Sequence, residues 1–189
     1  MKTQRKSFFS SKVFSLLIVI VVLLIIFTIW SEGQMIKPIN IRNIFNNLVL
    51  LSFIGIGACY LMLYGEMDLS AGAIGSFAGC LVAVSCMKLG LPAVPSFLIA
   101  LAGGALVGLI NALLINALGF AAFIATMSMS SVLQGCGYLL VTSSGINIQK
   151  VELVNWIGGT RLFNNLVPVT VILSIIFLVV YGIILSKTT

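Results

Sequence analysis

Six apolar runs dominate this sequence, and each is long enough to cross the ~30 Å hydrocarbon core of a bilayer as a helix. A backbone in lipid must satisfy its own hydrogen bonds, and the alternating pattern of a lipid-facing barrel is absent. The chain is therefore predicted to be an all-α integral membrane protein, a polytopic helix bundle with about six transmembrane helices. The predicted spans are Val13–Trp30, Leu48–Tyr64, Ala71–Met87, Ala93–Ile115, Ala121–Val141 and Val167–Leu185.

Composition supports the membrane class and excludes several kinds of catalytic and metal-binding site. Of 189 residues, 60% are hydrophobic and 7% are charged, whereas soluble domains carry roughly 25% charged residues. The chain has no histidine, which excludes histidine zinc sites and Ser-His-Asp triads. It also lacks the motif G-x-x-x-x-G-K-S/T, so it cannot hydrolyse ATP with a P-loop. No catalytic residue, metal or cofactor is expected.

The net charge of +6 is concentrated partly at the N-terminus, ahead of the first span. Basic residues in that position are typical of an orientation signal, and nucleic acid is not an expected partner. The first span is too long for a signal-peptide core and lacks a cleavage pattern, so it is interpreted as an uncleaved anchor. Residues 1–12 are predicted to be a basic cytoplasmic tail and residues 13–189 a transmembrane domain, with both chain ends inside.

Two longer polar connections, 31–47 and 142–166, are predicted to be outer loops. Each carries an asparagine pair at or next to its end, shortly before a span: Asn46–Asn47 and Asn164–Asn165. Asparagine accepts hydrogen bonds from the free amides of a first helical turn, so both pairs are expected to mark helix starts.

Polar side chains within the spans are the first candidates for function. Thr126, Ser130 and Gln134 recur every four residues in the fifth span, and Asn111 lies in the fourth. Such residues usually face the bundle interior or a wet cavity. They are interpreted either as the lining of a path for an uncharged, hydroxylated solute or as interhelical hydrogen bonds, and both interpretations stay open.

Glycines at four-residue spacing recur in the third and fourth spans: Gly75 and Gly79, then Gly104 and Gly108. Small residues at this spacing let helix backbones approach closely in a membrane. We expect them to serve helix packing.

The turn between the second and third spans reads Gly-Glu-Met-Asp-Leu-Ser-Ala-Gly over residues 65–72. It carries two carboxylates, Glu66 and Asp68, at the membrane boundary. Asp68 is expected to cap the third span, where its charge meets the positive helix end.

This turn resembles the Gly-Gly-Ile-Asp-Leu-Ser-Val-Gly signature of the ribose/xylose-type ABC sugar importer permeases. Residues 108–114, Gly-Leu-Ile-Asn-Ala-Leu-Leu, resemble that family's Gly-Leu-Ile-Asn-Gly-Leu-Leu. Residues 123–127, Phe-Ile-Ala-Thr-Met, are similar to its Pro-Phe-Ile-Val-Thr-Leu. Three motifs in the same order make the resemblance specific, although Glu66 replaces the commoner glycine.

The resemblance implies a permease subunit, not itself an enzyme, that moves a monosaccharide or similar small polar solute across the bacterial cytoplasmic membrane. Implied partners are a cytoplasmic ATP-binding subunit, an extracytoplasmic solute-binding protein, a second permease chain and membrane lipid. The residues expected along the translocation pathway are Asp68, Ser70, Asn111, Thr126, Ser130 and Gln134.

The family continues beyond a sixth segment into Thr-Arg-Phe-Gly-Arg and a cytoplasmic coupling helix, whereas this sequence ends in Ser186-Lys187-Thr188-Thr189. The chain is therefore expected to be the N-terminal part of a permease, truncated before the coupling helix. The alternative is a stand-alone six-helix channel or half-transporter that oligomerises.

Overall fold

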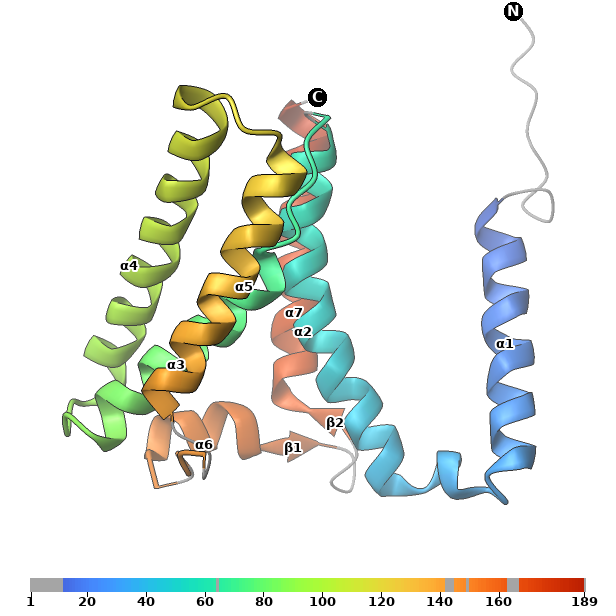
Figure 1. Ribbon diagram of the computed structural model, residues 1–189. Helices are drawn as coiled ribbons and strands as arrows, with labels where there is room; N and C mark the ends of the chain where they lie inside the picture. The colour runs from blue at the N-terminus through green and yellow to red at the C-terminus, as the bar shows by residue number, and fades with distance from the viewer. Residues whose placement is uncertain (1–11, 64, 142–144, 149, 163–166, 189) are drawn as a thin grey trace, which may run out of the picture. The chain divides into compact units, whose positions relative to one another are not determined.

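The computed structural model describes residues 12–63, 65–141, 145–148, 150–162 and 167–188 (Figure 1). The helices are α1 (Lys12–Trp30), α2 (Pro38–Leu63), α3 (Ala71–Met87), α4 (Ala93–Ala112), α5 (Ala122–Val141), α6 (Glu152–Gly159) and α7 (Val169–Thr188). Shorter elements are the 3-10 turn η2 (Gln34–Ile36), the π-helical turn η3 (Leu113–Ala117) and the strands β1 (Arg161–Leu162) and β2 (Val167–Pro168). The chain divides into two compact units, Met1–Phe45 and Asn46–Thr189, and each is described by itself.

All six predicted spans form helices, which confirms the all-α membrane fold. Three stretches are long and apolar enough to cross a membrane by length and composition: Pro38–Leu63, Ala93–Ala117 and Ala122–Val141. Three shorter apolar helices cover Phe14–Trp30, Ala71–Met87 and Val169–Leu185. A helix of about 17 residues rises about 26 Å, the lower limit for crossing a bilayer.

The first unit contains α1, η2 and the beginning of α2. The chain leaves α1 through Glu32 and Gly33, which both have positive φ, at 51° and 77°. The Ser31 hydroxyl accepts a hydrogen bond from the Met35 amide at 3.2 Å and so supports the following 3-10 turn. This tight connection explains how two helices can follow each other with few residues between them.

The second helix begins ten residues earlier than the sequence analysis predicted. Residues 38–47 belong to α2, so the predicted outer loop is shorter, and Asn46–Asn47 lie inside the helix rather than at its start. Proline is well suited to the first helical position because its φ is preset and its missing N–H has no partner there. The prediction was wrong because hydropathy marks the edge of the apolar run, whereas a helix can continue beyond it.

The second predicted loop also contains structure. The short helix α6 is followed by the antiparallel pair β1–β2, in which Arg161 faces Pro168 and Leu162 faces Val167. The sixth apolar helix consequently begins at Val169 rather than Val167. The second asparagine pair and Tyr64 lie outside the described residues, as does the basic tail apart from Lys12.

The core of the second unit lies where α3 packs against α4 and α5 (Figure 1). One buried cluster joins Ala73, Val107 and Leu133, one residue from each helix. A second joins Val82, Cys86 and Ala100, with side chains of α6 packed beside it. These residues are mostly small, as expected where helices in lipid associate through close packing.

Large apolar side chains cover the outer faces of these helices. Leu101 of α4 is 71% exposed and Leu139 of α5 is 84% exposed, and similar side chains line α7. Water would penalise an apolar surface of this extent, whereas a bilayer or further helices would not. The burial pattern therefore agrees with a membrane environment.

Candidate functional site

The turn that resembles the permease signature is held by its own side chains. Asp68 Oδ1 accepts hydrogen bonds from both the backbone N–H and the hydroxyl of Ser70, each at 2.6 Å. Ser70 is the N-cap residue of α3 and is fully buried. Asp68 therefore places its carboxylate just before α3, although it bonds to the cap residue and not to an amide of the first helical turn.

Figure 1 shows residues 65–70 running as extended chain from the end of α2 to the start of α3. Gly65, with φ of 80°, turns the chain out of α2. Extended backbone inside a membrane bundle is tolerated only where its polar groups find partners within the protein. The Leu69 N–H donates to Thr126 Oγ1 of α5 at 3.2 Å, and the Ser70 N–H donates to Asp68 Oδ1.

A third helix completes this arrangement. Asn111 of α4 is 6% exposed, and its Nδ2 donates to the Ser70 hydroxyl at 2.9 Å. Thr126 is 2% exposed and donates to the Ala122 carbonyl while it accepts from Leu69. We call Asp68, Ser70, Asn111 and Thr126 the signature cluster. It joins α3, α4 and α5 through one connected set of hydrogen bonds.

One atom of the signature cluster lacks a partner. Asn111 Oδ1 is buried and forms no hydrogen bond. A buried carbonyl oxygen left unpaired costs stability, so this atom offsets part of what the Asn111 hydrogen bond contributes.

The two remaining predicted pathway residues lie apart from the signature cluster. Ser130 is half-buried and Gln134 is exposed, one and two turns beyond Thr126 along α5. Gln134 Nε2 donates to Ser130 Oγ over 3.5 Å, the outer limit of a hydrogen bond. The structure therefore brings four of the six predicted residues together and separates the other two.

One cavity lies beside the signature cluster, and another lies beside Gln134. The first, of about 310 Å³, is lined by the signature-cluster residues Asp68, Asn111 and Thr126 together with Glu66 and Asn116. Its lining carries two carboxylates, so it is acidic. It adjoins η3, and π-helical turns of this kind occur often at functional sites.

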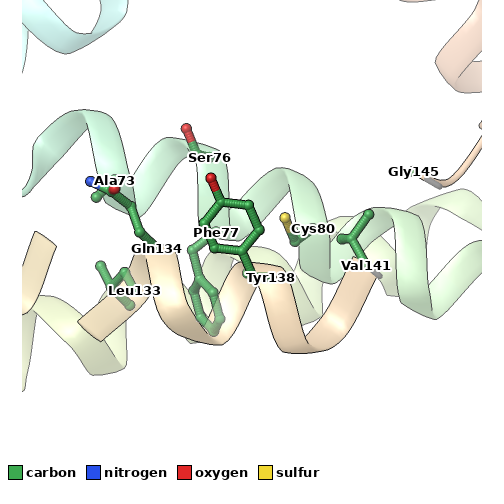
Figure 2. Close-up of a pocket in the computed structure, with 10 residues that line it drawn as sticks. Ala73, Ser76, Phe77, Cys80, Leu133, Gln134, Tyr138, Val141 and Gly145 are labelled. Atoms are coloured by element: carbon green, nitrogen blue, oxygen red, sulfur yellow. The ribbon is translucent and has the colours of Figure 1, made fainter. Parts of the chain in front are cut away.

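The second cavity, of about 420 Å³, lies between α3 and α5, and we call it the α3–α5 cavity (Figure 2). Its polar and aromatic lining comprises Ser76, Phe77, Gln134 and Tyr138, with Cys80 at its side. Among the described lining residues none is charged. Sequence analysis identified only Gln134 here. The sequence does carry a signal for the others, because Tyr138 follows Gln134 by four residues on α5 and Ser76 precedes Cys80 by four residues on α3.

The predicted packing glycines do not all lie at close contacts. A Cβ at Gly104 would lie 3.6 Å from Ile74, whereas a Cβ at Gly75, Gly79 or Gly108 would meet nothing within 4 Å. The tightest contact is at Gly103, where a Cβ would lie 2.5 Å from Leu81 Cδ1. Sequence analysis missed Gly103 because it lies next to the four-residue stripe and not on it.

The described residues contain no group of three or more histidine, cysteine or acidic side chains that could hold a metal ion. The four cysteines are free thiols: Cys59, Cys80, Cys86 and Cys136. What the site offers is a largely buried set of hydrogen bonds around the Asp68 carboxylate, beside one acidic and one uncharged cavity. This combination defines a polytopic membrane protein with polar cavities between its helices.

Sequence similarity to known proteins identifies the kind of membrane protein more closely. The chain is 30% identical over 162 residues to the D-allose transport system permease protein AlsC of Escherichia coli (strain K12), a match covering 84% of this chain and 48% of that protein. It is 26% identical over 176 residues to the L-arabinose ABC transporter permease protein AraH of Azospirillum brasilense, covering 90% and 50%. It is 28% identical over 142 residues to the ribose import permease protein RbsC of Escherichia coli (strain K12), covering 74% and 44%.

These similarities confirm the resemblance predicted from the three motifs: the chain is a homologue of the membrane permeases of sugar ABC importers. It spans about half the length of the curated relatives it matches. No family model and no solved structure matches it.

Proposed function

We propose that this chain forms part of the membrane permease of an ATP-binding-cassette importer that moves a monosaccharide or a similar small polar solute into a bacterial cell. The observation that carries the proposal is the convergence of the three family motifs. Asp68 and Ser70, Asn111 and Thr126 come from separate motifs, and they meet in one set of hydrogen bonds. The similarity to D-allose, L-arabinose and ribose permeases supports the sugar class.

The proposal includes three partners: an ATP-binding subunit, a solute-binding protein and a second permease chain. No P-loop motif occurs in the sequence, so ATP hydrolysis belongs to a cytoplasmic ATP-binding subunit. An extracytoplasmic solute-binding protein delivers the sugar, and a second permease chain completes the pathway. The N-terminus lies inside, because the basic residues before α1 favour the cytoplasmic side.

In this proposal the two groups of predicted pathway residues serve different purposes. The signature cluster holds the ends of α3, α4 and α5 in register, because the Asn111 amide bonds to the Ser70 hydroxyl and the Thr126 hydroxyl bonds to the neighbouring Leu69 N–H. Ser130 and Gln134 are accessible and only weakly bonded, so they are free to contact a solute.

The test is solute uptake. Cells that lack their own permease for a given sugar receive this chain together with the remaining part of the permease and the ATP-binding and solute-binding proteins of the same genome. Uptake of radiolabelled D-allose, L-arabinose and D-ribose is then measured. We expect at least one sugar to accumulate, and accumulation must stop when the P-loop lysine of the ATP-binding subunit is replaced. Passive flux that ignores that lysine would contradict the proposal and favour the channel alternative.

A further inference from the structure

The α3–α5 cavity combines features that suit one chemical class of ligand. Figure 2 shows Ser76 and Tyr138 directing their hydroxyl groups toward the same side, whereas the ring of Phe77 points the other way. Gln134 reaches toward α3 from the neighbouring turn of α5. The cavity volume of about 420 Å³ falls within the range of roughly 300–1,000 Å³ that small-molecule sites occupy.

The lining is neutral and mixed in character. Ser76 and Tyr138 each offer a hydroxyl that both donates and accepts, and the Gln134 amide offers two donors and an acceptor. Phe77 and the Tyr138 ring add aromatic faces. A ring-form monosaccharide presents the complement, with an apolar C–H face and a rim of hydroxyl groups. A charged solute would find no opposite charge among the described lining residues, and its desolvation would not be offset.

The polar groups of this cavity are also accessible. The Ser76 hydroxyl donates to the Gly72 carbonyl at 3.1 Å and keeps its acceptor side for a solute hydroxyl. The bond from Gln134 to Ser130 is long at 3.5 Å, so its exchange for a solute hydroxyl costs little. Tyr138 is 81% exposed. In the acidic cavity, by contrast, the Thr126 hydroxyl is buried and already bonded within the protein, and two carboxylates belong to the lining. The two cavities therefore differ in what they can offer to a neutral sugar.

We propose that the α3–α5 cavity is a monosaccharide-binding subsite, in which Ser76, Gln134 and Tyr138 bind sugar hydroxyls and the Phe77 and Tyr138 rings contact the apolar face. The inference rests on the proposed transport function and deepens it by assigning the solute to this cavity. Phe77, Ser76 and Tyr138 thereby become specificity-determining residues together with Gln134.

Cys80 provides a reporter because its side chain lines the same cavity. The full chain, with its partner subunits in proteoliposomes, is prepared with Cys80 as the single cysteine of this chain, and the rate of its alkylation by N-ethylmaleimide is measured. We expect D-allose, L-arabinose or D-ribose to lower that rate at least threefold in a saturable manner. Choline and sulfate serve as charged controls, and a variant with Cys59 as the single cysteine serves as a reporter on α2. Equal rates with and without all three sugars, or equal protection by the charged controls, overturn the subsite.

A second measurement uses the KM for uptake. We expect Gln134→Leu to raise the KM at least tenfold, whereas the matched substitution Ser131→Leu, at an exposed position outside the cavity lining, leaves it within twofold. An unchanged KM in Gln134→Leu overturns the subsite while the transport function stands. Sugar protection of Cys80 without any ATP-dependent uptake supports the subsite and overturns the proposed function.

Discussion

Asn111 donates a hydrogen bond from Nδ2 to the hydroxyl of Ser70 at 2.9 Å, joining α4 to the start of α3 across 41 positions of the chain. The Ser70 hydroxyl in turn donates a hydrogen bond to Asp68 Oδ1. The bond thus ties an amide near the end of α4 to an extended segment whose backbone would otherwise need water.

The first prediction concerns that bond. Asn111→Leu keeps the branch point at Cγ but replaces the amide with two bulkier methyl groups and removes the donor, which leaves the buried Ser70 hydroxyl with one partner fewer. We expect the free energy of unfolding to fall by about 1–3 kcal/mol. The measurement is detergent-induced unfolding followed by circular dichroism. Asn116→Leu is the control, since Asn116 is exposed, and its stability should stay close to that of the parent.

The second prediction separates a packing residue from a solute contact. Thr126→Val is nearly isosteric but cannot accept the hydrogen bond from the Leu69 N–H, so a backbone donor is left unpaired. We expect a loss of about 1–3 kcal/mol in folding stability and less protein in the membrane. Thr126→Ser keeps the hydroxyl and should restore most of both quantities. If Thr126→Val instead folds normally and only transport fails, Thr126 lines the route and the structural role is wrong.

The limits of sequence reasoning are clear on α5. Residues at i, i+4 and i+8 share a face only approximately, because each step of four drifts by about 40° around a helix of 3.6 residues per turn. Thr126 is therefore buried against the signature turn, whereas Gln134, two steps on, is exposed beside another cavity. The motif order indicated that Asp68, Asn111 and Thr126 matter, but only the structure shows that they line one cavity.

Helix positions were easier to predict than helix ends. The third span agrees with α3 at both ends, because polar and glycine residues flank the apolar run on each side. The start of α2 and the elements α6, β1 and β2 were missed, since hydropathy reports on lipid contact and not on backbone conformation. The predicted domain boundary at residue 12 and the pathway roles stay predictions.

The third prediction tests the closest helix contact. In Gly103→Ala the new Cβ meets Leu81 Cδ1 at 2.5 Å, so the Leu81 side chain must move. Gly103→Val adds more bulk and should cost about 1–3 kcal/mol of folding stability. The second substitution Leu81→Ala should recover part of that loss, and a double-mutant cycle of unfolding free energies measures the coupling. Gly75→Ala is the control because its Cβ would have open space, and equal effects at both glycines would count against the contact.

The final prediction concerns orientation. With the N-terminus inside, alternating helices place the turn before α3 on the cytoplasmic side and the turn after α3 outside. Glu66 and Lys88 are exposed and occupy these two turns. In a background without native cysteines, Lys88→Cys should react with a membrane-impermeant maleimide on intact spheroplasts, whereas Glu66→Cys should react only after permeabilisation. The reverse labelling pattern would show that the N-terminus lies outside. If every helix crosses the membrane, the two turns can change sides only when the whole topology is inverted.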